Sequence, residues 1–337
     1  MKLGELNFSS KKAYAWSILD GDSIFMTGGT GFFGTALLYS LLKVKSQKKV
    51  NINITILTRN ILSFSINHPK LFESKFIHCI QGDVTDFTFP DKKYSKILHF
   101  ATTTANETFN GESQLKKYKT LVNGTERVMQ FAEICGAKKV LFTSSGVVYG
   151  KTITGEVKET DAGAPITIDP TSALGHGKRS AEFIVAYYSE KYNIDYVIAR
   201  CFSFIGPELP LNIHYAIGNF IYDAKNKDTI TIKGDGSPIR SYLDIDDLII
   251  WLLVLIGNEC KYKIYNVGSD QVISILNLAK KIKSLLSPNI KINIIGSSKG
   301  SEDNFNRNVY APNISRARDE HSLDVWTDLD ESINKIK

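Results

Sequence analysis

The residues most suited to chemistry lie in a glycine-rich run near the start of the chain, at 27–34. Its glycines have the spacing of a loop that binds a dinucleotide. One glycine allows a tight turn, one lets the backbone approach the pyrophosphate, and one allows close helix–strand packing. Free N–H groups at the start of the following helix then face the phosphates. We therefore expect a dinucleotide to bind through Gly28, Thr30, Gly31, Phe32, Phe33 and Gly34.

The elements around this run are predicted from apolar patterning. An apolar run at 23–26 precedes the glycines and a helical pattern at 35–42 follows them. Strands and helices then alternate, which predicts an α/β fold with a Rossmann-type, doubly wound parallel sheet. The further strands are expected at 53–57, 76–80, 96–101, 139–143 and 196–202, and long helices at about 118–135 and 177–192.

The alternation loosens after about residue 205. Short segments and a turn at 234–238 mix there with expected helices at 246–257 and 274–286. We predict an NAD(P)-binding Rossmann domain over 1–205, in which residues 1–20 form a leading helical segment. Residues 206–337 are expected to form mainly a smaller C-terminal substrate-binding lobe, with some segments returning to the Rossmann domain.

Composition limits the classes of function. The chain has 337 residues, 43% of them hydrophobic, and a mild net charge of +6 that is spread along it. Its four cysteines lie far apart and lack metal-ligand or redox spacing, so no metal is expected. No signal peptide is recognisable, and the longest apolar run, 248–256, is about half of a membrane span. We expect a cytoplasmic protein that binds neither membrane nor nucleic acid.

The end of the second expected strand bears on the choice of cofactor. NAD enzymes usually place an acidic residue there to hold the ribose 2′-hydroxyl. This chain has Thr58 followed by Arg59, and a guanidinium pairs well with a 2′-phosphate. The pattern favours NADP, with NAD possible, and the alternative is a surface arginine just past a strand.

Further motifs follow in a consistent order along nearly the whole chain. They are the segments 82–86, 99–101, 123–125, 144–150, 177–182, 200–207, 219–221, 234–242 and 265–268. Together with the glycine run, this ordered set resembles the extended short-chain dehydrogenase/reductases, in particular the NAD(P)-dependent nucleotide-sugar epimerases and dehydratases. The resemblance implies adenine contacts from Asp83 and Val84, and nicotinamide-side contacts from Ala101 and Lys178.

The same resemblance locates a catalytic centre and a gap in it. The family pairs a Tyr with a Lys four residues later, aided by a Ser or Thr. Lys178 and Ser145 occupy two of these positions, but Leu174 stands where the Tyr belongs. Leu can neither donate nor accept a proton. His176 is a candidate replacement because imidazole titrates near neutrality, although its spacing from Lys178 directs it to another helix face.

Other polar residues near this centre have weaker claims. His176 has the alternative of being a surface or substrate-rim residue. Tyr149 is expected to pack beside the site, and His99 to be structural at a strand end. His214 is a candidate substrate contact.

The residues after Ser145 favour one class of reaction. Dehydratases and decarboxylases of the family carry acidic residues there, whereas this chain has Gly146 and Val147. The pattern favours a 4-keto reductase or 4-epimerase acting at sugar C4, in activated-sugar or surface-polysaccharide biosynthesis. A 4,6-dehydratase or decarboxylase is one alternative. A non-catalytic protein that binds dinucleotide and nucleotide sugar is another, because of Leu174.

The expected partner is a nucleotide-diphosphate sugar. The resemblance implies that Arg240 grips its pyrophosphate and that Asn219 adds an amide contact. Ser203 stands where the family commonly has Asn, and Thr102 and Ser145 complete the expected substrate contacts. A homodimer is expected to form through the helices near 120–135 and 177–192.

Overall fold

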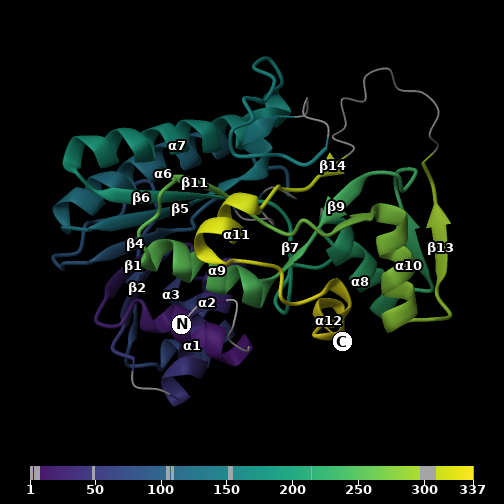
Figure 1. Ribbon diagram of the computed structural model, residues 1–337, viewed down its shortest axis with the longest axis horizontal. Helices are drawn as coiled ribbons and strands as arrows, with labels where there is room; N and C mark the ends of the chain where they lie inside the picture. Colours follow the sequence, from purple (N-terminus) through teal and green to yellow (C-terminus); the bar gives the residue numbers. More distant parts are fainter. Residues whose placement is uncertain are drawn as a thin grey trace.

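A seven-stranded parallel sheet forms the centre of the larger part of the molecule (Figure 1). The computed structural model describes residues 3, 8–47, 50–103, 107, 110–150, 155–213, 215–296 and 309–336. The strand order β11-β6-β5-β4-β1-β2-β3 reverses direction beside β1, as in a doubly wound Rossmann fold, which confirms the predicted fold class. The strands are β1 (Ser23–Thr27), β2 (Asn53–Thr58), β3 (Ile77–Gln81), β4 (Lys96–His99), β5 (Lys139–Ser145), β6 (Asp195–Cys201) and β11 (Ile264–Val267).

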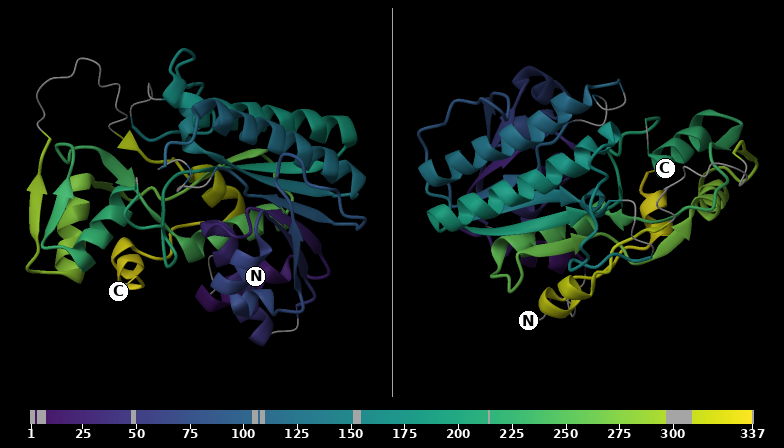
Figure 2. Two further views of the ribbon diagram at one scale, coloured as in Figure 1. Left: turned by 180° about the vertical axis from the view of Figure 1, so that it is seen from behind. Right: turned by 90° about the horizontal axis from the view of Figure 1, so that it is seen from above.

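Helices cover both faces of this sheet. On one face, α1 (Phe8–Ser17), α2 (Phe32–Gln47) and α9 (Ile245–Gly257) pack together. On the other, the long helices α6 (Gln114–Ile134) and α7 (Ala173–Tyr192) lie side by side (Figure 2). The short helices α3 (Ile61–Asn67) and α4 (Pro69–Phe72) pack beside β3.

The burial of α9 shows why this helix belongs to the Rossmann domain. Its residues 248–256 are all buried, at 1% exposure or less. A helix that is apolar on every side is stable only inside a core. The chain therefore returns from the lobe at α9 and then adds β11 at the edge of the sheet beside β6.

The smaller lobe lies beside the carboxyl ends of the strands (Figure 2). It has its own apolar core. The paired strands β7 (Phe204–Ile205) and β10 (Leu243–Asp244) connect it to the sheet, as does α11 (Ser315–His321), which packs against β11. The lobe elements are α8 (Ala216–Asn226), β8 (Thr229–Ile232), β9 (Ile239–Ser241), β12 (Val272–Ser274), α10 (Ile275–Leu286), β13 (Lys291–Ile294), β14 (Val309–Tyr310) and α12 (Leu329–Asn334).

Two expected boundaries differ from the structure in ways that matter for the site. The strand expected to reach residue 101 ends at His99, because its neighbour β1 ends at Thr27. The helix expected from residue 177 begins at Ala173, following a short 3-10 turn whose first amides are capped by Asp169. Leu174 therefore lies in regular helix one turn before Lys178. In the described ranges, no helix combines the length and apolar character needed to cross a bilayer.

Candidate active site

The glycine loop between β1 and α2 has no room for side chains at two of its three spaced glycines. Gly28 has φ +71°, and a Cβ there would lie 2.7 Å from the backbone nitrogen of Ala101. A Cβ on Gly34 would overlap the backbone of Gly28 and Gly29. At Gly31 the nearest atom would be 3.4 Å away, so this glycine faces comparatively open space.

The start of α2 completes this cradle. The helix begins at Phe32, so its first N–H groups lie at the glycine loop, where they suit a pyrophosphate. Thr30 is exposed and Phe32 half-buried, whereas Phe33 packs edge-on against Phe204 at 5.0 Å between ring centroids. The residues present therefore fit a dinucleotide.

Arg59 and Asp83 flank the expected adenosine end of this cradle. Arg59 Nη1 donates to Glu107 Oε1 at 2.7 Å. This hydrogen bond raises the pKa of Arg59, and the carboxylates of Asp83 and Glu112 act in the same direction. Arg59 is thus paired with one carboxylate, and two more add negative charge near it, which makes the place unfavourable for a further dianion.

Val84, in the loop after β3, packs closely against a glycine of the central helix. A Cβ on Gly124 in α6 would lie 2.8 Å from a methyl group of Val84. The asparagine–glycine–threonine segment of α6 therefore allows the loop after β3 to approach the helix.

His99 joins three elements beneath the cradle. Its Nδ1 lies 2.7 Å from Thr27 Oγ1, and its Nε2 lies 3.0 Å from Thr125 Oγ1. Burial and the nearby Lys178 ammonium lower the pKa of His99 to about 3. Thr27 Oγ1 also accepts a hydrogen bond from the Ala101 amide. The neutral imidazole therefore links β1, β4 and α6, and Ala101 sits at the strand end beside it.

Lys178 is buried at the same edge of the sheet. Its Nζ donates to the carbonyl of Thr143 at 2.6 Å and lies 4.7 Å from the ring centroid of Phe142. Burial lowers the pKa of Lys178 to about 8. Ser145 ends β5 and its oxygen accepts from the Val147 amide at 3.4 Å, which leaves its hydroxyl hydrogen available for another acceptor.

A buried polar network supports Ser145 from below. Arg200 binds Glu182 with two hydrogen bonds, of 3.0 and 2.7 Å, and Ser144 donates to the same carboxylate. The guanidinium also lies 4.7 Å from the ring centroid of Tyr149. Tyr149 in turn donates to Asn266 in β11 at 2.7 Å. Tyr149 therefore lies beneath the site, as expected from the sequence.

Leu174 occupies the position where a tyrosine is expected four residues before Lys178. It is half-buried in the first turn of α7. His176 follows two residues later, with Nε2 3.0 Å from the carbonyl oxygen of Ile166. A carbonyl can only accept, so this nitrogen carries the proton and His176 ties α7 to the loop before it. This contact directs His176 towards that loop.

Gly146 has a neighbour that sequence reasoning missed. A Cβ on Gly146 would lie 2.8 Å from Tyr310 Oη and 2.8 Å from the ring of Phe202. Tyr310 comes from β14 in the lobe, far away in the sequence. The glycine itself was the available signal, because an absent side chain beside Ser145 leaves space that another side chain must fill.

The expected substrate residues are distributed around the mouth of the lobe. Arg240 lies in β9, donates to the carbonyl of Ile239 at 2.8 Å, and has its pKa lowered by burial. Asn219 in α8 has a buried Oδ1 with no hydrogen-bond partner in the described part of the chain. Ser203 is partly buried between β6 and β7, and Thr102 is exposed past β4. His214 lies outside the described residues.

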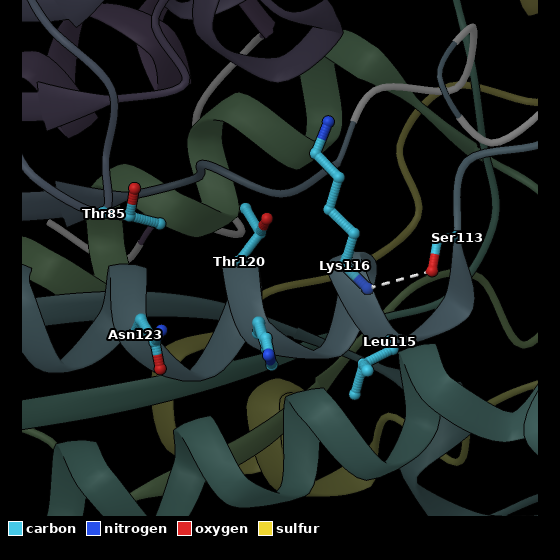
Figure 3. A pocket seen from close by; sticks show the side chains of 7 residues that line it. Thr85, Ser113, Leu115, Lys116, Thr120 and Asn123 are labelled. Carbon is cyan, nitrogen blue, oxygen red and sulfur yellow. Dashed lines mark hydrogen bonds between the residues drawn. The ribbon is translucent and has the colours of Figure 1, made fainter.

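A hollow of about 400 Å³ lies away from this centre, between the loop after β3 and the first turns of α6 (Figure 3). Its lining includes Thr85, Lys116, Lys119 and Asn123, and none of Ser145, Lys178 or Arg240. The hollow is therefore not the place where the candidate catalytic groups meet.

Comparisons with known proteins agree with this architecture. The model of the NAD dependent epimerase/dehydratase family matches residues 24–268. UDP-glucuronic acid decarboxylase 6 of Arabidopsis thaliana is 29% identical over 297 residues, which cover 88% of this chain and 82% of the plant protein.

Solved structures show the same fold. The UDP-N-acetylglucosamine 4-epimerase of Methanobrevibacter ruminantium, in complex with UDP-N-acetylmuramic acid, is similar with a TM-score of 0.78 and 22% identity, over 94% of this chain and 97% of that one. The UDP-glucuronic acid 4-epimerase of Bacillus cereus, in complex with NAD, has a TM-score of 0.75 and 21% identity, over 93% and 97%.

Proposed function

The chain belongs to the NAD-dependent epimerase/dehydratase family, and on that premise we propose that it is an enzyme acting at C4 of a nucleotide sugar, as a 4-keto reductase or a 4-epimerase. The observation that carries the proposal is the filled space at Gly146. Tyr310 and Phe202 occupy the volume that a side chain there would need. An acidic group for elimination therefore cannot be placed directly after Ser145, and an exchange of hydride and proton at one carbinol suits the site better.

The roles of this chain's own residues follow from their places. A nicotinamide dinucleotide held by the glycine loop would supply or accept the hydride. Ser145 donates a hydrogen bond to the sugar oxygen without giving up its proton, and the Lys178 ammonium provides positive charge at the ribose. Arg240 and Asn219 hold the diphosphate from the lobe. This assignment places sugar C4 at the carboxyl end of β5.

The carboxylates near Arg59 lead us to propose NAD as the cofactor, in place of the NADP expected from the sequence. Arg59 is already paired with Glu107, and Asp83 and Glu112 add negative charge. A 2′-phosphate would meet these carboxylates, whereas a 2′-hydroxyl can donate to one of them. Titration calorimetry with NAD and NADP tests this proposal, and tighter binding of NADP would contradict it.

Decarboxylation of a nucleotide-linked uronic acid is the second candidate function. It is favoured by the curated relatives, which are named UDP-glucuronic acid decarboxylases and match most of this chain. It is disfavoured by Gly146 and Val147, which give the site no carboxylate after Ser145.

One experiment separates the candidates. The purified protein is incubated with NAD or NADPH and with UDP-glucose, UDP-glucuronic acid or a 4-keto nucleotide sugar, and the products are identified by NMR. A C4 epimer or a reduced 4-keto sugar supports the proposal, whereas release of CO₂ supports the decarboxylase. Tight cofactor binding without any turnover supports a non-catalytic binding protein.

We also propose a homodimer formed through α6 and α7. These helices lie together on an outer face of the molecule (Figure 2), and large apolar side chains on them are exposed. They include Phe183, which is 69% exposed, and Tyr187 stacked on it at 6.2 Å. Sedimentation as a monomer at micromolar concentration would contradict the dimer.

A further inference from the structure

The proposed reaction needs a proton donor that Leu174 cannot provide. Three titratable side chains near the site have other partners. His176 is hydrogen-bonded to Ile166 in the preceding loop, and Tyr149 is fully buried and donates to Asn266. His99 is buried between two threonines. The donor must therefore come from elsewhere in the fold.

Tyr310 brings a phenol to the missing donor's neighbourhood from the lobe. Its Oη lies 2.8 Å from where a Cβ on Gly146 would be, directly after Ser145. Its ring packs against Phe202 with centroids 4.8 Å apart, and the residue is only partly buried. The ring is thus held by packing, and the residue is not fully enclosed.

A cation accompanies this phenol. β14 pairs in parallel with β9 so that Tyr310 lies opposite Arg240. Burial lowers the pKa of Arg240, and the nearby phenols of Tyr242 and Tyr310 act in the opposite direction. A positive charge beside a phenol stabilises the phenolate. In the Tyr–Lys pair expected from the sequence, the lysine stabilises the tyrosinate in this way.

We propose that Tyr310 is a catalytic residue whose Oη exchanges the proton with the sugar oxygen, in place of the phenol absent at position 174. The proposal rests on the proposed function. In the direction of reduction, the O–H bond of Tyr310 breaks as the new O–H bond forms on the sugar oxygen. The phenolate left beside Arg240 then takes a proton from water. Oxidation runs through the same steps in reverse.

The decisive variant is Tyr310→Phe, which removes one oxygen and keeps the ring on Phe202. We expect kcat with the turned-over nucleotide sugar to fall by about 10²-fold or more, the usual contribution of a general acid. The Kd for UDP-glucose in the cofactor-free protein should change by less than about tenfold. Tyr262→Phe is the matched control, because Tyr262 is 38% exposed and lies outside the site.

A second variant tests the replacement directly. Adding Leu174→Tyr to Tyr310→Phe returns a phenol to α7 one turn from Lys178, and we expect it to recover part of the lost kcat. Retention of the wild-type kcat by Tyr310→Phe alone would overturn the inference.

If the wild-type protein turns over none of these nucleotide sugars, the proposed function fails, and a spectroscopic measurement tests separately whether Tyr310 contacts the sugar. UDP-glucose binding should perturb tyrosine ultraviolet absorbance in the wild type and in Tyr262→Phe, and much less in Tyr310→Phe. An equal perturbation in all three proteins would overturn contact between Tyr310 and the sugar.

Discussion

Two arginine–carboxylate pairs in this molecule have the same shortest distance and opposite surroundings. Arg200–Glu182 and Arg59–Glu107 both close to 2.7 Å. The first pair is 10% exposed on each side and lies beneath Ser145, whereas the second is 56% and 30% exposed at the edge of the cofactor cradle. Burial, not distance, therefore decides what each pair does. Arg200–Glu182, the inner pair, holds the strand end that carries Ser145, and Arg59–Glu107, the outer pair, can yield to a ligand.

The largest expected effect comes from breaking the inner pair. Glu182→Ala leaves a buried guanidinium without its carboxylate, and we expect the free energy of unfolding to fall by about 3–5 kcal/mol. Urea unfolding followed by circular dichroism measures this loss. Glu190→Ala, on the exposed face of the same helix, is the matched control and should change stability by about 0.5 kcal/mol or less. Equal losses of unfolding free energy in Glu182→Ala and Glu190→Ala would contradict the expected difference between the buried and the exposed position.

Double-mutant cycles sharpen the comparison further. For Glu182→Leu with Arg200→Met, we expect a coupling energy of about 2 kcal/mol or more, because removing both charges is far less harmful than removing one. The corresponding cycle for Glu107→Gln with Arg59→Met should give about 0.5 kcal/mol or less. Similar coupling in both cycles would show that burial does not separate the pairs.

Lys178 is a buried cation, and no carboxylate in the described ranges forms a salt bridge with it. Burial lowers its pKa from 10.5 to about 8 in the folded protein. Below pH 8 both states hold the proton. Between pH 8 and 10.5 the unfolded chain holds more of it, so this group makes folding more favourable as the pH rises, by at most about 1.4 kcal/mol per pH unit.

Lys178→Met should remove that rise. We expect the wild-type unfolding free energy, measured relative to the variant, to increase between pH 8 and 10. A difference that stays constant over this range would contradict the lowered pKa. The ammonium form of Lys178 should also dominate only below about pH 8. Because this charge is proposed to contact the cofactor ribose, the affinity of the wild type for the cofactor should weaken above that pH.

The smallest effect concerns the outer pair. Glu107→Gln frees Arg59 from its carboxylate, and we expect affinity for NADP to rise by about 1 kcal/mol relative to NAD, roughly fivefold, with stability nearly unchanged. Titration calorimetry with both cofactors measures the ratio. Glu73→Gln, an exposed glutamate outside the site, is the control. An unchanged ratio would mean that Glu107 does not influence the choice of cofactor.

The sequence predicted well whatever depends on local backbone constraints. The glycine spacing at 28, 31 and 34 and the alternating apolar runs led to the correct fold class, since close backbone approach and strand burial leave direct traces in residue type. The start of α7 was placed four residues too late, because Gly175 and Gly177 weaken helix propensity while packing overrides it.

Contacts between distant segments could not be predicted in this way. Glu107 lies beside Arg59 only because the segment after β4 approaches the end of β2. Tyr310 reaches Gly146 only because β14 pairs with β9 in the lobe. Neither contact produces a periodic pattern in the sequence. The carboxylates near Arg59 and the phenol near Gly146 are therefore seen only in the tertiary structure.

The return of the chain to the sheet through α9 and β11 has a consequence for synthesis. A ribosome releases β1 to β6, with the glycine loop, Ser145 and Lys178, well before the strand that covers the edge of β6. Until Val267 has emerged, β6 presents unpaired backbone groups, an edge on which other chains can aggregate. A fragment ending at Pro207 would therefore carry Ser145 and Lys178 and still be prone to aggregation, so the lobe must be made before the sheet of the Rossmann domain is complete.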